Sequence, residues 1–595
     1  MNTNTLQAAL AAHQQGDLVR AEQLYRAILA TGDDPDALQL LGALKARQGD
    51  HDEAIRLMRH SLRINPGQPN VLNNLGNSLK RKGALLEATR HYREALTMDP
   101  AYLDAARNLI STLAETGRDE ESNVLLQDML TRYPTDPALL ALGGRSHESA
   151  GRFQFAIELY RRSLNIRPDH AATLNSLGVS YRLDNQPRQA LACFDRLLEM
   201  GVRDYQVVHN AANAHADLGD LETAMAYYRE VIDLNPTFVE AHKNLGSLLW
   251  SMGDQASFLD SFERTFQSGR VTDEMILARG ESLLTAERPA DAIAALDERP
   301  PSDGGPDLLD LKARCLLETG DFDAAIACHE EACRLSDDSR FRLMHGITRL
   351  RIGDIERAHE LLDRVFTEEP ANQYALSHLA VCWRLLGDPR AEAVNNWRDL
   401  VRTYELPTPP GYSSLAEFNA HLNDCLTRLH TSREHPMDQT LRGGTQTQGN
   451  LFGREQKEIR EFVNGITVRL HEHLAHLKTV PKPFPMFDTA DNFTFSASWS
   501  VRLRDQGFHT MHIHPMGWFS SAYYVDLPPV IDDTSQAGWL VFGQPNFDVG
   551  LEPIHAVRPV AGQLTLFPSY LWHGTRPFTD EHPRTTIAFD IVAVS

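Results

Sequence analysis

Over its first two thirds the chain repeats one pattern of apolar and polar positions: two helical segments, a short turn between them, and a break. Residues 73–100 show the plan, with apolar residues three or four positions apart on either side of a turn near Gly83. Prolines recur 34 residues apart, at positions 66, 100, 134 and 168, and Pro236 falls two periods later. Because a helix interior does not accommodate proline, each one predicts the end of a second helix.

A column of small residues has the same period on the first helices. It runs through Ala8, Gly42, Gly76, Gly144, Gly178, Ala212, Gly246 and Gly280, with an interruption at Ile110. It then slips by one residue to Ala313 and continues at Gly346 and Ala380. Small side chains let neighbouring helices pack closely. The two columns together resemble the tetratricopeptide repeat, with about twelve units over residues 1–402.

Stacked repeats of this kind form an all-α solenoid whose concave groove suits extended peptides or protein segments. In some members of the family, asparagines at similar positions clamp a peptide backbone. The candidates here are Asn74, Asn108, Asn175 and Asn210. The alternative is that these four are ordinary exposed helix residues.

The helical pattern stops at Pro407, Pro409 and Pro410, and we expect a linker with a connecting helix over residues 403–434. Beyond about residue 490 the pattern changes to short segments rich in β-branched and aromatic residues, separated by Gly, Pro and Asp. Their spacing is typical of a small antiparallel sandwich or barrel. The sequence therefore predicts a multidomain chain, helical first and mainly β after residue 435.

Composition narrows the functional classes. Asp and Glu number 80 against 58 Lys and Arg, giving a net charge of -22, which argues against a nucleic-acid-binding surface. The six cysteines form no CxxC pair, so a reducing compartment is expected. The first residues predict an amphipathic helix instead of a signal peptide, and there is no apolar run of ~18 residues. We expect a cytoplasmic protein without a membrane partner; whether it is a homo-oligomer is left open.

Three histidines fall within six residues, at His509, His512 and His514. On a regular strand, residues two apart point to the same face, so His512 and His514 would lie together and His509 opposite. Two neutral imidazoles on one face can hold iron, zinc or copper. A polar patch beside a strand is the competing interpretation of the pair alone.

Two later residues extend this pattern. His573 is expected in the turn after a strand over residues 562–568, and Arg584 at the start of the last strand, with Thr586 on the same face. An arginine so placed can hold a carboxylate through two parallel hydrogen bonds. Taken singly, His573 could be an ordinary turn histidine and Arg584 a surface partner of an acidic residue, with Glu581 and Asp590 as candidates.

The order of HxH, distant His and Arg resembles the iron(II)- and 2-oxoglutarate-dependent dioxygenases, and in particular the bacterial oxygenases fused to tetratricopeptide repeats. The blocks "HTMHIHPMGWFSSAYYVDLP" and "GQLTLFPSYLWHGTRPF" carry the resemblance. It implies a cupin-like double-stranded β-helix (jelly roll) over residues 435–595. It also implies that His512, His514 and His573 bind Fe(II), while Arg584, assisted by Thr586, binds the co-substrate 2-oxoglutarate.

The same resemblance implies hydroxylation of a peptide or protein presented by the repeat groove. One departure stands out, because His514 occupies the place where the superfamily has a carboxylate. The alternative function is a non-catalytic scaffold with a degenerate metal-binding β domain. A repeat-fused glycosyl- or sulfotransferase is disfavoured, since no phosphate-binding loop is present in the last third. Further pocket candidates are Asp505, Asp526, His555, Arg502, Tyr523 and Tyr524.

Overall fold

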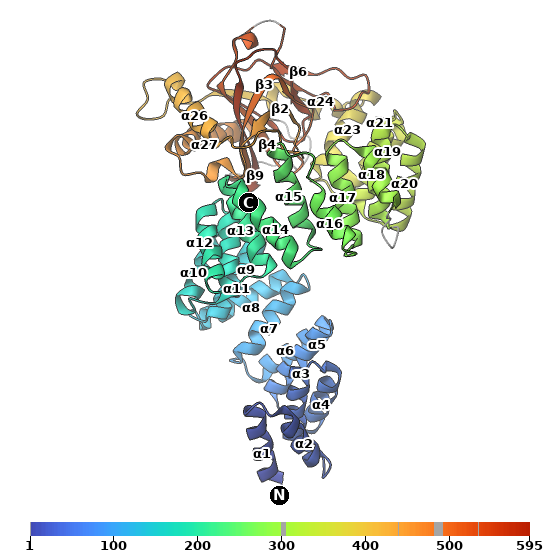
Figure 1. The fold of residues 1–595 in the computed structure, drawn as a ribbon, viewed down its shortest axis with the longest axis vertical. Helices are drawn as coiled ribbons and strands as arrows, with labels where there is room; N and C mark the ends of the chain where they lie inside the picture. The colour runs from blue at the N-terminus through green and yellow to red at the C-terminus, as the bar shows by residue number, and fades with distance from the viewer. Residues whose placement is uncertain (1, 299–304, 438, 481–491, 533–534, 595) are drawn as a thin grey trace. The chain divides into compact units, whose positions relative to one another are not determined.

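The computed structural model describes residues 2–298, 305–437, 439–480, 492–532 and 535–594. The chain divides into two compact units, Met1–Asp184 and Asn185–Ser595. Figure 1 labels their helices and strands. The fold class expected from the sequence is confirmed: an all-α solenoid of tetratricopeptide repeats is followed by a mainly antiparallel β domain of the jelly-roll type.

The first unit consists of helices that follow one another as antiparallel pairs. They are α1 (Asn2–Gln14), α2 (Leu18–Leu29), α3 (Pro35–Arg47), α4 (His51–Ile64), α5 (Pro69–Arg81), α6 (Leu85–Met98), α7 (Leu103–Glu115), α8 (Asp119–Arg132), α9 (Pro137–Ser149), α10 (Phe153–Ile166) and α11 (Ala171–Leu183). Several begin at an aspartate whose side chain accepts a backbone N–H, as at Asp17, Asp34 and Asp50. Such caps satisfy donors that the first helical turn leaves unpaired.

At two positions of the small-residue column a first helix meets a tyrosine of the second. A Cβ atom added at Gly76 would lie 2.5 Å from the Tyr92 ring, and one added at Gly144 would lie 2.4 Å from the Tyr160 ring. Both tyrosines are fully buried. The close approach of an aromatic ring therefore explains the glycine at these two positions.

Helix α9 offers a matched test of this packing. We expect Gly144→Ala to destabilise the first unit by about 1–3 kcal/mol, because the new methyl group overlaps the Tyr160 ring. Gly143→Ala should be neutral or stabilising, since its Cβ would meet only the movable methyl ends of Leu159 and Leu130 while alanine favours the helix by about 1 kcal/mol. Denaturant unfolding of both variants followed by circular dichroism checks this. Equal effects of the two substitutions would contradict the packing explanation.

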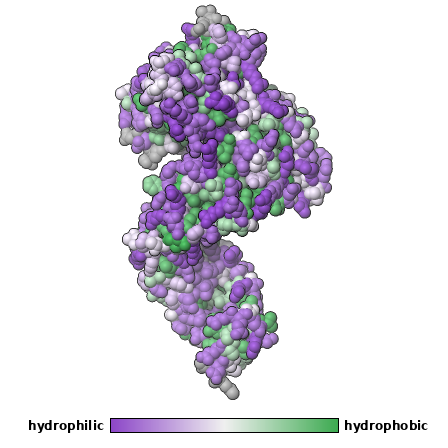
Figure 2. All heavy atoms as spheres, turned by 60° about the vertical axis from the view of Figure 1, so that its left-hand side comes forward, coloured by the Kyte–Doolittle hydropathy of each residue, from purple (hydrophilic) through white to green (hydrophobic). Residues whose placement is uncertain are grey.

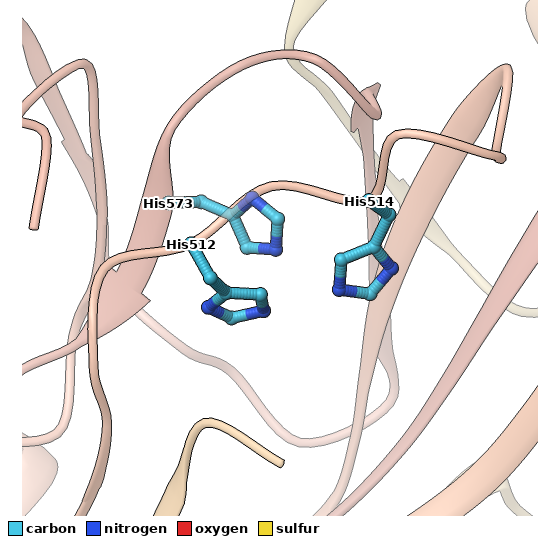
Figure 3. A group of neighbouring side chains, drawn as sticks. All are labelled: His512, His514 and His573. Carbon is cyan, nitrogen blue, oxygen red and sulfur yellow. The ribbon is translucent and has the colours of Figure 1, made fainter. Parts of the chain in front are cut away.

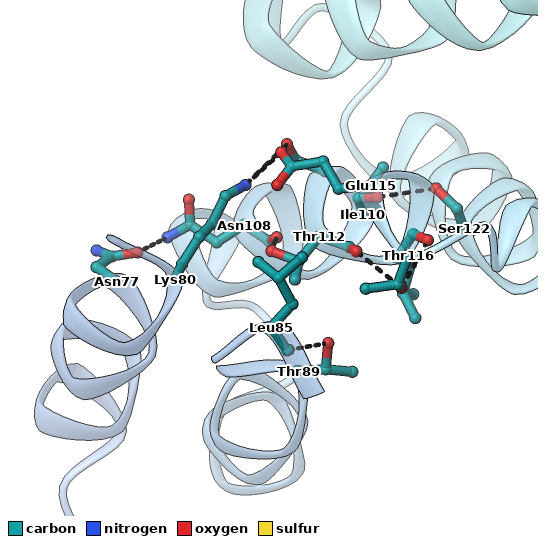
Figure 4. Close-up of polar contacts among 12 residues, drawn as sticks. Asn77, Lys80, Leu85, Thr89, Asn108, Ile110, Thr112, Glu115, Thr116 and Ser122 are labelled. Carbon is teal, nitrogen blue, oxygen red and sulfur yellow. Dashed lines mark hydrogen bonds and ion pairs between the residues drawn. The ribbon is translucent and has the colours of Figure 1, made fainter. Parts of the chain in front are cut away.

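One of the four recurring asparagines joins neighbouring repeats. The amide nitrogen of Asn108 donates to the side-chain oxygens of Asn73 and Asn77, each at 2.9 Å, so it links α7 to α5 (Figure 4). Beside it, the Lys80 ammonium lies 2.6 Å from the Glu115 carboxylate. In the described structure the Asn108 amide nitrogen thus holds repeats together, and a peptide-clamping role for these asparagines remains a prediction.

The second unit begins with further helices of the repeat region. Its helices are α12 (Pro187–Glu199), α13 (Tyr205–Leu218), α14 (Leu221–Leu234), α15 (Val239–Ser251), α16 (Asp260–Gln267), α17 (Asp273–Thr285), α18 (Pro289–Glu298), α19 (Pro306–Thr319), α20 (Phe322–Leu335), α21 (Ser339–Arg351), α22 (Ile355–Glu368), α23 (Gln373–Leu386), α24 (Arg390–Val394) and α25 (Trp397–Leu400). Among the described residues, no helix is both long and apolar enough to cross a membrane. The face of the protein in Figure 2 is mostly hydrophilic, with hydrophobic residues scattered over it.

A histidine buried between these helices makes stability depend on pH. Burial, with His345 and Arg314 nearby, lowers the pKa of His329 to about 3. Neither ring nitrogen has a hydrogen-bond partner among the described residues, and the Asp310 carboxylate lies 3.7 Å away. Below pH ~6.5 this histidine is therefore protonated in the unfolded chain but stays neutral in the folded protein, so the free energy of unfolding falls as the pH falls.

We expect His329→Leu to remove the part of the pH dependence that this histidine contributes. Wild type should lose about 2 kcal/mol more unfolding free energy than the variant between pH 7 and pH 5. This is the linkage value for one site over the ~1.5 pH units between pH 5 and the unfolded-state pKa. Urea unfolding at the two pH values checks it. The exposed His471→Gln is the control, and should keep the wild-type dependence. The same dependence in His329→Leu as in wild type would show that His329 is not the responsible group.

The β region has two antiparallel sheets. The larger has the strand order β1-β7-β4-β9-β3-β2, and the smaller has the order β6-β5-β8. The strands are β1 (Arg402–Glu405), β2 (Leu441–Gln446), β3 (Asn492–His509), β4 (Phe519–Asp526), β5 (Leu540–Phe542), β6 (His555–Val557), β7 (Gln563–Pro568), β8 (His573–Thr575) and β9 (Arg584–Val594). Helices α26 (Leu415–Leu429) and α27 (Lys457–Leu477) pack with β4, β7 and β9 into one apolar core.

The segment predicted as a linker is part of this β region. Its first residues form β1, which pairs with β7 along the edge of the large sheet. Its helix α26 buries Phe418 and Leu422 in the core shared with the sheet. A string of prolines signals the end of the repeats, but it does not reveal that the chain after them pairs with a strand far along the sequence.

Candidate metal centre

One face of strand β9 carries Arg584 at its start and Asp590 near its end. Residues two apart on a strand share a face, so Arg584, Thr586, Ala588 and Asp590 point the same way. The first three of these line a pocket together with His509, His512, His514 and His573. The opposite face of β9 carries Ile587, Phe589 and Ile591 into the apolar core.

Three histidines come together in this pocket. One ring nitrogen from each of His512, His514 and His573 lies within 4.8 Å of the other two. Figure 3 shows the three imidazoles around a common space, two from the loop after β3 and one from β8. Their ring centroids are 4.2 to 5.2 Å apart. The sequence prediction placed these residues together, and the structure does so.

The local backbone differs from the expectation. His512 and His514 are not on a regular strand, but in the loop that follows β3, and His573 starts the short strand β8 instead of lying in a turn. His512 and His573 exchange two backbone hydrogen bonds, of 2.8 and 2.9 Å, as an isolated antiparallel bridge. The N–H of His514 donates to the carbonyl of Ser569 at 2.9 Å. Backbone pairing with segment 569–573, and not strand alternation, sets the three rings.

The outer ring nitrogens are all engaged by acceptors. Nδ1 of His512 lies 2.8 Å from the Thr510 carbonyl, and Nδ1 of His573 lies 2.9 Å from the Leu571 carbonyl. Nδ1 of His514 lies 2.7 and 2.8 Å from the two carboxylate oxygens of Asp590. A carbonyl oxygen only accepts, so Nδ1 of His512 and Nδ1 of His573 each carry a proton, and their Nε2 atoms face the common space. The Asp590 carboxyl group takes the same place behind Nδ1 of His514.

Electrostatics also favour the neutral, ligating form of two of these rings. Burial, with the neighbouring histidines, holds the pKa of His512 and of His573 well below the usual range of histidine. A neutral imidazole with a free Nε2 is the form that binds a transition metal. The cluster therefore has the residue type and the orientation that a metal ion needs, and two of its rings are held in the neutral form.

Arg584 is a buried cation in the same pocket. Its guanidinium carbon lies 5.4 Å from the centroid of the Tyr524 ring, and its Nε has no hydrogen-bond partner among the described residues. Burial lowers the pKa of Arg584 from its usual value. Neither Glu581 nor Asp590 pairs with it, which excludes the surface ion pair considered from the sequence. Thr586, also buried, lines the pocket two residues further along β9.

His509 lies in the pocket too, contrary to the expectation that it faces away. It ends β3, and its ring centroid is 5.8 Å from that of His512. Its Nδ1 lies 3.2 Å from the Thr440 hydroxyl, and burial together with Arg584 lowers the pKa of His509 to about 3. It is not one of the three histidines whose nitrogens converge. It is a neutral wall residue of the pocket.

Of the remaining candidates, only Tyr524 lies on the pocket side. Asp526 bonds Asn423 and His582, and the Asp505 carboxylate accepts the backbone N–H of Asp580. The ring of His555 stacks on Trp397 at 3.8 Å. Strand register puts Arg502 opposite Thr585, and so on the face away from Arg584. Of the two tyrosines, Tyr524 is on the pocket side with Arg584, while Tyr523 donates to Asn419 in the apolar core.

The last helices of the solenoid contact the metal-site segment directly. The indole N–H of Trp572, the residue before His573, donates to the Ser377 carbonyl at 3.2 Å. The Tyr570 hydroxyl donates to the Val394 carbonyl at 2.7 Å, and the Gln373 side chain donates to the Gly517 carbonyl in the loop after His514. One apolar core contains Tyr570 and Trp572 together with α21–α23. Sequence patterns gave no sign of these contacts.

Fold and site together define a tetratricopeptide-repeat solenoid joined to a β domain with a three-histidine cluster. Comparison with known families agrees. A family model described as "Putative 2OG-Fe(II) oxygenase" matches residues 497–590. Models of tetratricopeptide repeats match residues 33–101, 79–145, 139–201, 212–253, 306–339 and 343–395. The chain thus carries tetratricopeptide repeats followed by a domain of this 2OG-Fe(II) oxygenase family.

Individual relatives match parts of the chain. Photosystem I assembly protein Ycf3 of Acaryochloris marina (strain MBIC 11017) is 30% identical over 95 residues, which are 15% of this chain and 57% of that protein. The match thus spans little more than half the length of that relative. Pseudomonas aeruginosa PilF shares 20% identity with a TM-score of 0.32, covering 35% of this chain and 94% of PilF. Yeast Tom70 shares 13% identity with a TM-score of 0.29, covering 66% of this chain and 97% of Tom70.

Proposed function

We propose that the protein is an Fe(II)- and 2-oxoglutarate-dependent dioxygenase that hydroxylates a peptide or protein. The observation that carries the proposal is the convergence of three histidine nitrogens beside a buried arginine that lacks a partner at Nε. We assign His512, His514 and His573 as the metal ligands. Arg584 and Thr586 are assigned to the co-substrate.

The donor set fits iron(II). Three neutral imidazoles supply three nitrogen ligands, and three positions of an octahedral ion would stay open for a keto acid and dioxygen. The backbone bridge between His512 and His573 fixes two ligands before any metal binds, which lowers the entropic cost of assembling the site. The chemistry supplied by bound Fe(II) is the coupled oxidation in which 2-oxoglutarate and O2 yield succinate and CO2 while a substrate C–H becomes C–OH.

Arg584 supplies a buried guanidinium group that can bind the far carboxylate of 2-oxoglutarate. A buried guanidinium is a costly group unless an anion completes it, and its unpartnered Nε is consistent with an acceptor that arrives with the ligand. The Thr586 hydroxyl, on the same face of β9, adds a second polar contact. The apolar walls of the pocket, which include Val501, Leu540 and Phe567, keep water away from the reacting atoms.

The solenoid is proposed to present the substrate. Stacked tetratricopeptide repeats form extended surfaces for protein contacts, and α23 is packed against the segment that carries His573. We assign residues 1–402 to the repeats. Because β1 and α26 belong to the sheet and its core, we propose that the catalytic domain begins near residue 402 and not at 435. A cytoplasmic location without nucleic-acid partners accords with the charge of -22 and the absence of CxxC pairs.

Turnover of the keto acid without added substrate tests the proposal. Purified protein given Fe(II), 2-oxoglutarate and air should form succinate and CO2 in equal amounts, slowly, because the co-substrate half of the reaction runs uncoupled. Omitting iron or oxygen should abolish the signal. A protein that holds metal but neither consumes nor binds 2-oxoglutarate would instead support the scaffold function.

A further inference from the structure

Asp590 is a buried carboxylate whose position follows from strand β9. It lies on the pocket face, six residues beyond Arg584, and is 7% exposed. Its oxygens lie 2.7 and 2.8 Å from Nδ1 of His514, and the Ser520 hydroxyl donates to one of them at 2.7 Å. Ser520 in turn lies 2.9 Å from the Ser569 hydroxyl, so the carboxylate ends a short buried polar network.

The three histidines differ in the acceptor that faces their Nδ1 atom. His512 and His573 each meet a peptide carbonyl, a neutral acceptor. Only His514 meets a carboxyl group, and among the described residues no other carboxyl group touches a histidine of the cluster. His514 is also the residue that stands where related oxygenases are expected to have a carboxylate. The one carboxyl acceptor therefore lies behind the one histidine at the exceptional position.

A carboxyl group buried in this way needs partners. Desolvating a carboxylate costs several kcal/mol unless hydrogen bonds and a nearby positive charge compensate it. Among the described residues its side chain meets two donors, the His514 ring and Ser520, and no cationic side chain lies against it. A divalent metal on the far side of the His514 ring would supply that positive charge, and the carboxylate would in turn raise the basicity of Nε2.

We propose that Asp590 is a positioning residue that makes His514 an anion-backed ligand. The His514–Asp590 pair then takes the part that a directly bound carboxylate has in a two-histidine, one-carboxylate set. The carboxyl group is retained, but it lies behind the His514 ring instead of on the metal. This inference rests on the proposed metal centre, and it explains how a histidine serves at position 514.

Metal affinity of Asp590→Asn tests the role, with Co(II) alone as the probe. Asparagine keeps an acceptor for Nδ1 of His514 but removes the charge. We expect Co(II) to bind ten- to a hundred-fold more weakly, as is typical for loss of an outer-shell partner, and the visible spectrum of the Co(II)-loaded protein to shift. Asp526→Asn, which removes a carboxylate of the same domain that does not touch the cluster, should change neither. The melting temperature of the metal-free protein should be similar in both variants.

A double-mutant cycle distinguishes positioning from general damage. In a His514→Ala background, Asp590→Asn should have no further effect on Co(II) affinity, because Asp590 acts through that ring. A loss of the same size in both backgrounds would mean that the carboxylate is only structural. Binding within two-fold of wild type, with an unchanged spectrum, would also overturn the role. If wild type itself binds no Co(II), the metal centre fails first, so the two failures are distinguishable.

Discussion

Replacing His512 by alanine is expected to weaken Fe(II) binding by at least about 100-fold and to abolish keto-acid turnover. Loss of an outer-shell partner alone costs ten- to a hundred-fold in affinity, and here one of three direct ligands disappears. The fold should survive, because His512 joins His573 through backbone atoms that alanine keeps. Metal content after dialysis against Fe(II) under argon, with a thermal melt of the metal-free protein, measures both effects.

His509→Ala is the matched control. It removes a neighbouring buried histidine that lines the same pocket but is outside the converging group. Its metal content should stay close to that of wild type. Equal retention of metal by His512→Ala and His509→Ala would show that the three-histidine cluster is not the metal site.

The second large effect is expected from removing the solenoid. A chain that starts at residue 403 lacks the helices that cover Tyr570 and Trp572, next to His573, which we propose as a metal ligand. We expect it to aggregate or to lose more than about 90% of its metal. A chain that starts at residue 185 keeps the whole second compact unit, and should bind metal like the full chain.

Trp572→Ala in the full chain separates the loss of this contact from the other consequences of truncation. Removing a buried Trp costs about 3–5 kcal/mol, and here the affected backbone holds His573. We expect a lower melting temperature together with weaker metal binding. If the chain from residue 403 binds metal as tightly as the full chain, the packing of α23 on the site has no functional consequence.

Much of this organisation could be predicted from sequence because it is periodic or contiguous. The period of 34 follows from helix pairs that pack in the same way, so one pattern predicts many units. The histidine cluster was predicted for a different reason: HxH and the distant His and Arg have residue types whose chemistry narrows their use. Neither argument needed a contact between distant segments to be known.

What the sequence missed depends on contacts between distant segments. Asp590 was weighed only as a surface partner of Arg584, because nothing along the chain places it beside His514, 76 residues earlier. Asp590 follows Arg584 by an even number of residues on one predicted strand, and this spacing was an available sign that the two share a face. His509 was misplaced because the chain leaves β3 directly after it, where strand alternation no longer applies. The packing of Trp572 on α23 follows from the tertiary fold alone.

The central claim is that one pocket holds a metal and a keto acid side by side. Calorimetric titration of 2-oxoglutarate into metal-loaded protein under argon tests it most directly, with wild type, Arg584→Ala and His512→Ala compared. We predict that wild type binds the keto acid. Arg584→Ala should keep its metal but bind the keto acid at least about ten-fold more weakly. His512→Ala should bind neither the metal nor the keto acid. Equal keto-acid affinity in wild type and Arg584→Ala, or no binding to metal-loaded wild type, would contradict the account.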